Sequence, residues 1–294
     1  MPDEVIIGDD SENSNFEQAV AEFYLNHPTL PCDLKYYRNP QQLGVNANFY
    51  SVAEKASGDI VFFCDQDDFW LPGKIEKFAS VFEQNSAIDA VCCFSVFTDA
   101  DLKPWALQDQ SELNALNRCG KKTLFELFLK NMLSGAGHNI AIRKSILTEL
   151  PVWGNCFLYD SWLLRSCAAA GSLKFIRERL TLHRVHGENL TGHPEVDFKR
   201  TVAMRMKKNG SAELSKLFSE WQEFEVNLNN SPYREKVTQG HRKSLQNCIS
   251  YLERRIQYRS RPLFLRFIFS LLLLKDYFLF GNGFRSAVRD IADL

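Results

Sequence analysis

The stretch from Asp59 to Trp70 constrains the fold more than any other part of the sequence. Its apolar residues, Ile60 to Cys64, form an unbroken run that predicts a strand buried on both faces, as in a parallel sheet. Asp65, Asp67 and Asp68 follow this strand directly. In an open α/β sheet, ligands bind at the carboxyl ends of the strands. The sequence therefore predicts a ligand site where this strand ends.

The acidic cluster after this strand has two interpretations. Closely spaced carboxylates repel one another unless a cation or hydrogen-bond donors offset their charge. Oxygen ligands suit Mg²⁺ or Mn²⁺, which keep coordination positions open for substrate phosphates. The first interpretation is therefore a metal site that holds a phosphorylated substrate. The alternative is an acidic turn that caps the next helix, since Pro72 fits a first helical position.

Strands and amphipathic helices alternate along the N-terminal part of the chain. Further apolar strands are predicted at Glu4 to Gly8, Leu34 to Arg38 and Asp89 to Phe97. Between the strands, apolar residues recur at helical spacing, which predicts helices that cover the sheet with one face. This alternation predicts an α/β fold with a mainly parallel sheet.

Three polar motifs follow later in the chain. Leu133 to Asn139 is a loop whose glycines either let the backbone approach a ligand or simply make a turn. Asp160 lies in the first turn of a predicted helix. It either has a catalytic role or simply supplies a negative charge that interacts favourably with the helix dipole. Arg184 and His186 follow the last predicted strand. None of these motifs assigns a function by itself.

Composition argues against several classes of protein. The 35 Lys and Arg residues nearly equal the 36 Asp and Glu residues, so the overall charge does not indicate nucleic-acid binding. The 8 Cys residues include no Cys-x-x-Cys spacing, which argues against zinc and disulfides and favours reduced thiols in the cytoplasm. The N-terminus shows no signal-peptide pattern. No apolar run reaches the ~18–20 residues that span a bilayer.

Beyond Gly192 the sequence pattern becomes helical. We therefore expect a catalytic domain at residues 1–192 and a helical extension at 193–294. Residues 254–294 contain eight Lys or Arg against three Asp, and Leu263 to Phe280 is mostly apolar. A basic, apolar helix of this kind can lie in the interface of an anionic membrane. The alternative is a helix packed back onto the catalytic domain, and the sequence does not decide between the two.

The order of these motifs resembles that of a family-2 glycosyltransferase of the GT-A fold, and within it the bacterial rhamnosyltransferase-like group that builds surface polysaccharides. The resemblance covers about residues 3 to 192. The motifs that carry it are Ile6 to Asp10, Gly44 with Asn48, Gly58-Asp59, Asp65 to Asp68 with Trp70 and Lys74, Ser134 to Gly137, Tyr159 to Trp162, and Arg184 to Asn189.

The resemblance implies inverting, metal-dependent transfer of a sugar, hexosyl or rhamnosyl, from a nucleotide-diphosphate donor to a hydroxyl acceptor. The cofactor is then Mn²⁺ or Mg²⁺, and the donor a UDP- or dTDP-sugar. The residues that the resemblance assigns to the donor side are Asp10 at the nucleotide base, Asp65 near the ribose, Asp67, Asp68 and His186 at the metal, and Arg184 with His186 on the segment that closes on the diphosphate.

On the acceptor side, the resemblance assigns Asp160 as the general base. Ser134, Gly135, Gly137 and Trp162 are assigned to the lining of the acceptor site. The chemistry requires the same residue types independently, because charge develops on the leaving diphosphate and a cation stabilises it. Inversion also needs a carboxylate within about 3 Å of the acceptor hydroxyl to take its proton.

The expected partners and location follow from the same resemblance. The acceptor is expected to be a glycan or a lipid-linked molecule, in a pathway that makes O-antigen-like or capsule-like surface polysaccharide. No nucleic-acid partner is expected. The protein is expected to be cytoplasmic and peripheral on the inner face of the cell membrane.

The sequence departs from the family pattern at its N-terminus. The family normally opens with an additional apolar strand, whereas Met1 here directly precedes what resembles the family's second strand. We therefore expect a sheet without the usual first strand, which exposes a sheet edge. Two explanations stay open: an internal start of a longer protein, or altered or lost base recognition. The alternative function is an inactive glycosyltransferase-like binding or scaffolding protein.

Overall fold

The computed structural model describes residues 1–294 except 14, 108–109, 119–122, 151–157, 187–209 and 293–294. The strands are β1 (Glu4–Asp9), β2 (Asp33–Arg38), β3 (Ile60–Phe62), β4 (Phe69–Trp70), β5 (Ala90–Thr98), β6 (Pro104–Leu107), β7 (Ile140–Arg143) and β8 (Leu173–Arg184). The helices are α1 (Asn15–Asn26), α2 (Val45–Lys55), α3 (Lys74–Gln84), α4 (Gln110–Arg118), α5 (Leu124–Leu129), α6 (Ile146–Glu149), α7 (Tyr159–Ala170), α9 (Gly210–Asn230), α10 (Gln239–Arg259), α11 (Leu263–Leu272), α12 (Leu274–Phe280) and α13 (Phe284–Ala292), with short 3₁₀ helices η1 (Gly137–Asn139) and η2 (Pro232–Lys236).

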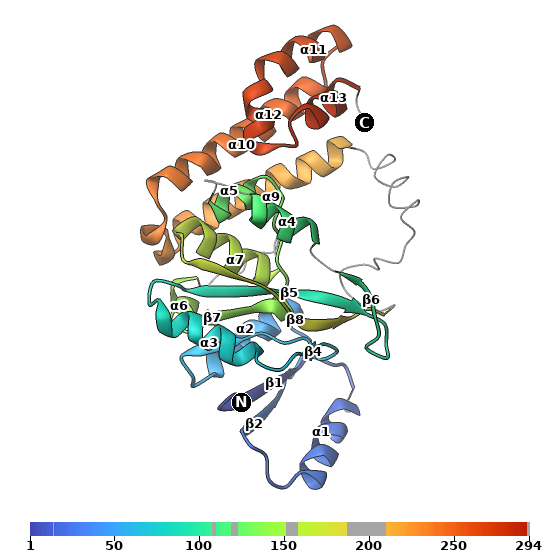
Figure 1. The fold of residues 1–294 in the computed structure, drawn as a ribbon, viewed down its shortest axis with the longest axis vertical. Coiled ribbons are helices and arrows are strands. Elements are labelled where there is room, and N and C mark those ends of the chain that lie inside the picture. The colour runs from blue at the N-terminus through green and yellow to red at the C-terminus, as the bar shows by residue number, and fades with distance from the viewer. Residues whose placement is uncertain (14, 108–109, 119–122, 151–157, 187–209, 293–294) are drawn as a thin grey trace.

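β1 and β2 form a parallel two-stranded sheet near one end of the molecule (Figure 1). Asp9 lies opposite Arg38 where the two strands end. α2 packs on β1, and the Asn48 side-chain amide donates to the Gly8 carbonyl at 2.9 Å. Among the described strands, β1 pairs only with β2, so no strand joins it to the larger sheet.

The larger sheet has the strand order β3–β7–β5–β8–β4, and β6 pairs with β5. The α/β class is thus confirmed, but the predicted mainly parallel pairing is corrected. Within the described part of this sheet, β5 and β8 run parallel and the remaining pairs are antiparallel. β7 lies between β3 and β5 in the opposite direction. Unbroken apolar runs report burial on both faces of a strand, and they do not encode its direction.

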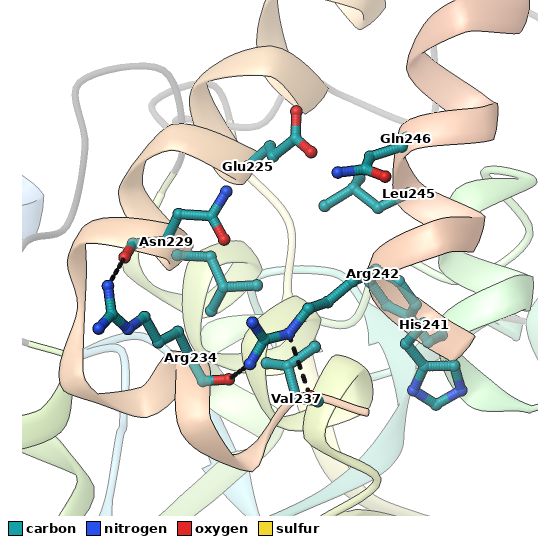
Figure 2. A pocket seen from close by; sticks show the side chains of 10 residues that line it. Glu225, Asn229, Arg234, Val237, His241, Arg242, Leu245 and Gln246 are labelled. Atoms are coloured by element: carbon teal, nitrogen blue, oxygen red, sulfur yellow. Dashed lines mark hydrogen bonds between the residues drawn. The ribbon is translucent and has the colours of Figure 1, made fainter. Parts of the chain in front are cut away.

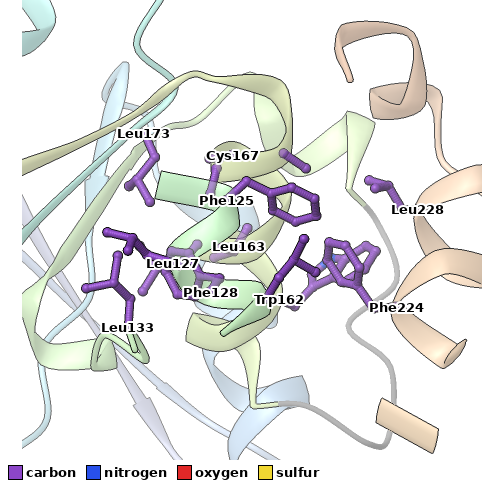
Figure 3. Close-up of a cluster of buried hydrophobic side chains, with 14 of the residues drawn as sticks. Phe125, Leu127, Phe128, Leu133, Trp162, Leu163, Cys167, Leu173, Phe224 and Leu228 are labelled. Carbon is purple, nitrogen blue, oxygen red and sulfur yellow. The ribbon is translucent and has the colours of Figure 1, made fainter. Parts of the chain in front are cut away.

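Helices cover both faces of the larger sheet. On one face, Phe78 and Phe82 of α3 pack against Val91, Cys93 and Leu180. On the other face, side chains of α5, α7 and α9 interdigitate in the cluster drawn in Figure 3. The C-terminal helices therefore complete the core that begins in the N-terminal part.

The predicted division of the chain near residue 192 falls in the segment 187–209, outside the described residues. The division itself stays a prediction. The described parts on either side of it share one hydrophobic cluster, since Phe125 of α5 packs in it against Trp221 and Phe224 of α9. None of the helices in the described ranges combines the length and apolarity needed to cross a bilayer.

A buried polar network also connects the C-terminal helices to the sheet. The Tyr233 hydroxyl of η2 donates to Asp89 Oδ2 at 2.6 Å and lies 2.8 Å from the Ser172 hydroxyl. Tyr233 is fully buried, and Asp89 and Ser172 are also buried. Because these groups are shielded from water, the loss of any of these hydrogen bonds would lower the stability of the fold.

Replacing Tyr233 with Phe should lower the free energy of unfolding by about 1–3 kcal/mol, because Asp89 Oδ2 loses its hydrogen-bond donor inside the protein. Urea denaturation measures this change. Tyr37→Phe is the matched control, since Tyr37 is exposed and its change should stay within about 0.5 kcal/mol. Equal effects of the two substitutions would contradict a role for the network.

Candidate active site

The ends of β3 and β8 meet at a cluster of carboxylates and histidines. Asp67 lies in the loop that follows β3, and His186 lies just after β8. His186 Nε2 is 2.7 Å from Asp67 Oδ2, although the two residues are 119 positions apart in the chain. Arg184 Nε donates to the Asp67 carbonyl at 3.0 Å. The fold thus brings two separate segments into direct contact at this point.

Asp68 carries the buried carboxylate of the cluster. Its Oδ1 lies 2.8 Å from His183 Nδ1 and accepts a hydrogen bond from the Arg184 amide at 3.1 Å. Its Oδ2 is buried without a hydrogen bond of good geometry, and His138 Nδ1 lies 3.1 Å from it. Burial acts to lower the pKa of His183, but the Asp68 carboxylate outweighs burial and the pKa is raised.

His138 lies at the centre of the cluster and is buried. Its ring stacks on that of His183, with the centroids 4.4 Å apart. Ser95 Oγ accepts from Asn139 Nδ2 at 2.6 Å and lies 2.9 Å from His138 Nε2. The Ser95 hydroxyl therefore links Asn139 to His138 Nε2, while His138 Nδ1 faces the Asp68 carboxylate.

Lys74 supports His138 from the buried side. Lys74 Nζ donates to the His138 carbonyl at 2.6 Å and to Thr181 Oγ1 at 2.8 Å. It also lies 4.2 Å from the centroid of the Trp70 ring. Burial lowers the pKa of Lys74. These contacts hold the backbone that carries His138 against β8.

Asp160 lies in the first turn of α7, beside the same cluster. The Ser161 amide donates to Asp160 Oδ1 at 2.6 Å. Burial raises the pKa of Asp160 and the charge of Asp65 raises it further, although amide hydrogen bonds from Ser161 and Gly137 oppose the shift. A carboxylate with a raised pKa is a stronger base than an exposed one.

The glycines of the loop 134–137 let it pack tightly against α7. Gly135 has φ +70°, and a Cβ there would lie 2.1 Å from Leu164 Cδ1. A Cβ on Gly137 would lie 2.0 Å from the Tyr159 hydroxyl oxygen. A side chain at either position would push the loop away from the helix that carries Asp160. The glycines thus allow close packing within the protein, and the approach of a ligand to this loop stays a prediction.

Asp10 lies apart from the cluster, just after β1. Its carboxylate accepts hydrogen bonds from the amides of Leu43 and Gly44, at 2.7 and 2.8 Å, and from Asn39 Nδ2 at 2.8 Å. Asp10 therefore holds the loop that precedes α2. A hollow of about 440 Å³ opens beside it. The residues that line this hollow are Ser11, Glu12, Arg38, Asn39, Pro40, Gln41 and Gln42.

Most of the predicted site residues lie around His138. Asp65 Oδ2 is 3.6 Å from His138 Nδ1, on the same side as Asp68. Ser134 is held at the edge of the site, where its amide donates to Glu112 Oε1 at 2.9 Å. The predicted residues that the described contacts connect to this cluster are Asp65, Asp67, Asp68, Gly137, Asp160, Arg184 and His186.

The prediction that Trp162 lines the acceptor side is wrong. Trp162 is fully buried and packs edge-on against Phe224, with the ring centroids 5.4 Å apart (Figure 3). An α-helix turns roughly 100° per residue, so Trp162 points roughly 200° away from Asp160. If Asp160 faces the site, Trp162 must face the core.

Four polar residues of the site were not predicted from the sequence. They are Lys74, Glu112, His138 and His183. His138 offers a weak sequence signal, because it follows the glycine loop directly. Glu112 offers none, since nothing in its local sequence distinguishes it from an exposed helical residue. Burial raises its pKa. Their roles depend on contacts between distant segments.

The residues present suit a divalent cation. Ligand atoms of Asp68, His138 and His183 all lie within 4.8 Å of one another. A second pair, Asp67 and His186, combines a carboxylate with an imidazole and is less buried than Asp68. Carboxylates are typical ligands of Mg²⁺ and Mn²⁺, and imidazole suits other transition metals. The donor atoms therefore fit a metal site without selecting the metal.

A separate pocket of about 140 Å³ lies between α9, η2 and α10 (Figure 2). Its arginines are bound to nearby carbonyls: Arg242 Nε donates to Val237 O and Arg234 Nη1 to Asn229 O, each at 3.2 Å. None of the residues that line it belongs to the cluster around His138. This pocket is therefore not part of the candidate active site.

The α/β fold, with carboxylates and histidines where its strands end, is of the GT-A type, and the comparisons with known proteins identify the family of the chain. Residues 1–150 match the family model described as Glycosyl transferase family 2, and the chain belongs to this family. In fold, it is similar to residues 1–349 of S. aureus TarS in complex with UDP. That likeness has a TM-score of 0.50 and 13% identity, over 85% of this chain and 63% of that one.

Curated relatives match the chain over part of their length. The uncharacterized glycosyltransferase alr2836 of Nostoc sp. is 21% identical over 196 residues, which cover 63% of this chain and 56% of that protein. The uncharacterized protein Rv1520 of Mycobacterium tuberculosis is 30% identical over 195 residues, which cover 65% of this chain and 52% of that protein. The chain spans about half the length of these relatives.

Proposed function

We propose that this chain catalyses inverting, metal-dependent transfer of a sugar from a nucleotide-diphosphate donor to a hydroxyl acceptor. The observation that carries the proposal is the 2.7 Å contact between Asp67 and His186, with Asp160 held beside the same cluster. The pathway is the assembly of an O-antigen-like or capsule-like surface polysaccharide, and the sugar is a hexose or rhamnose. This pathway rests on the sequence resemblance.

Asp160 acts as the general base in this proposal. In its ionised form, the Asp160 carboxylate takes the proton of the acceptor hydroxyl as that oxygen attacks the anomeric carbon. The attack comes from the face opposite the diphosphate, so the configuration inverts and no covalent nucleophile is required. Gly137, whose amide bonds to Asp160, fixes the position of this carboxylate relative to the acceptor loop.

Asp67 and His186 would hold the metal, and the buried Asp68 would support them through His183 and Arg184. A bound divalent cation would stabilise the negative charge that develops on the leaving diphosphate. Arg184 spans the site from β8, since its guanidinium donates to the carbonyls of Asp67 and Ala100. It keeps the segment that carries His186 in place over the loop that carries Asp67.

The hollow beside Asp10 is proposed to receive the base and ribose of the donor, with Asp65 on the ribose side. Arg38, Gln41 and Gln42 line it and supply hydrogen-bond donors for a uracil or thymine ring. The fold neighbour TarS was solved with UDP, which supports a UDP- or dTDP-sugar as the donor. The acceptor is proposed to be a glycan or a lipid-linked molecule.

Titration calorimetry with UDP and with dTDP, each with and without Mn²⁺, tests this proposal. We expect one nucleotide to bind, and its affinity to fall about tenfold or more when the metal is withheld, because the diphosphate then loses its counter-charge. Asp67→Asn should remove the metal-dependent part of the affinity. Asp101→Asn is the matched control, because Asp101 is an exposed carboxylate in the loop that follows β5.

Binding of neither nucleotide would contradict the proposal. Binding that is identical with and without Mn²⁺ would contradict metal dependence. Metal-dependent binding without transfer or donor hydrolysis would instead favour a binding or scaffolding protein.

A further inference from the structure

One side of α11 is apolar and exposed to solvent. Six of its side chains, at spacings of four residues, form what we term the α11 stripe. Phe264 and Leu272, near the two ends of the helix, are each 72% exposed. The α11 stripe consists of Leu263, Phe264, Phe267, Ile268, Leu271 and Leu272.

Neighbouring helices extend this apolar surface. Phe278 of α12 and Phe284 of α13 are both exposed and contact each other, with ring centroids 5.1 Å apart. α11, α12 and α13 lie together at the end of the molecule opposite β1 and β2 (Figure 1). An exposed apolar surface on this scale is unusual for a protein surface that faces only water.

The side of these helices that faces α10 combines aromatic packing, in which Phe269 stacks on Tyr258, with one buried carboxylate. Asp290 of α13 is buried and accepts hydrogen bonds from Arg255 Nε at 2.6 Å and Arg255 Nη2 at 2.8 Å. The Tyr277 hydroxyl donates to the same carboxylate at 2.6 Å. These contacts attach α12 and α13 to α10 through a satisfied polar network. Turning α12 and α13 over would break that network, so their exposed apolar faces stay on the outside, beside the α11 stripe.

The charge of this region has one sign on its outer surface. Within the described part of α11 to α13, the two acidic side chains are both paired with arginines of α10, Asp276 with Arg254 at 2.7 Å and Asp290 with Arg255. Basic side chains of the same segment are exposed around the apolar surface. They are Arg261, Lys275, Arg285 and Arg289.

We propose that the α11 stripe and the adjoining faces of α12 and α13 bind the surface of an anionic lipid bilayer. The apolar side chains would enter the boundary between headgroups and acyl chains, and the basic side chains would contact the lipid phosphates. A second copy of this chain fits the surface less well, because two surfaces of the same positive charge would repel each other. This proposal goes beyond sugar transfer and does not depend on it.

Cosedimentation of the full-length chain with vesicles tests the proposal. The probes are vesicles of phosphatidylcholine mixed with phosphatidylglycerol, and vesicles of phosphatidylcholine alone. We expect partitioning onto the anionic vesicles that weakens as salt is added. Phe264→Gln combined with Leu272→Gln should weaken it about tenfold or more. Leu25→Gln is the matched control, since Leu25 is 83% exposed on α1 at the far end of the molecule.

The charge contribution is tested separately. Arg285→Gln and Arg289→Gln should each weaken partitioning onto anionic vesicles about fivefold, whereas Lys243→Gln on the exposed face of α10 should not. Circular dichroism and thermal melting show that each variant is folded.

Partitioning that is equal for both vesicle types, or unchanged in the Phe264/Leu272 double variant, would overturn the proposal. Sedimentation velocity in the absence of lipid tests whether a second copy of the chain occupies the surface instead. If the wild-type chain forms a concentration-dependent dimer that the double variant abolishes, and does not bind vesicles, the surface binds a second copy and the bilayer proposal is overturned.

Discussion

Replacing Asp160 with Asn should lower turnover about 10²–10⁴-fold while leaving donor affinity unchanged, because the amide cannot accept the proton of the acceptor hydroxyl. The substitution keeps the size of the side chain, and the Ser161 amide can still donate to its carbonyl oxygen. Turnover is measured as transfer, or as hydrolysis of the nucleotide sugar whose nucleotide calorimetry identifies. Calorimetry on the variant reports donor affinity.

The pH dependence provides an independent readout of the same prediction. Burial raises the pKa of Asp160, and the base must be ionised to act. The wild-type kcat/KM should therefore fall as the pH falls through a pKa above the ordinary range of an aspartate, about 3.9. Asp160→Asn should remove this acidic limb from the residual activity. Retention of the limb in the variant would assign it to another group.

Glu112→Gln is the matched control for Asp160. Burial also raises the pKa of Glu112, and its carboxylate lies beside the same loop, where it accepts from the Ser134 amide. We expect only a small change in turnover, since Glu112 anchors the loop in our proposal. A loss of turnover with Glu112→Gln but not with Asp160→Asn would transfer the role of base to Glu112.

Replacing Asp67 with Asn should lower turnover by at least about 10³-fold and remove its dependence on Mn²⁺. A metal contributes several kcal/mol to the stabilisation of charge on a leaving group, and each 1.36 kcal/mol corresponds to a tenfold change in rate. The Asp67 side chain is 17% exposed, and thermal melting checks that the variant is folded. Initial rates over a Mn²⁺ titration measure the effect.

A double variant distinguishes a shared metal from two independent contacts. If Asp67 and His186 hold the same ion, then Asp67→Asn combined with His186→Asn should be no slower than either single variant, because residues that act as a unit are not additive. Effects that multiply would indicate two separate roles. Full turnover of either single variant would remove the proposed metal site.

Several features of the site were predictable because each depends on the residues of one short segment. The apolar run before Asp65 predicts a buried strand, and its carboxylates follow where ligands bind in an α/β fold. The helical spacing around Asp160 places that residue in a first turn, where the structure has it. The resemblance then connected Asp67 with His186, and the two are in contact.

Other features were not predictable, because they depend on contacts between distant segments. His138 of η1 and His183 of β8 are 45 positions apart in the sequence, yet their rings stack on each other. Lys74 resembles an ordinary charged residue at a helix start, yet it is buried beneath His138. Trp162 was the avoidable error, since helical periodicity alone places it opposite Asp160.

The sequence by itself determined the class of fold and the identity of the acidic and basic groups, because local apolar periodicity and residue chemistry are properties of short segments. Tertiary structure alone decided that β7 runs antiparallel between β3 and β5, and that Asp68 points to buried histidines. It also decided which side of α11 faces solvent. The physical reason is that strand direction and side-chain partners depend on packing between distant segments, and a local sequence pattern contains no information about that packing.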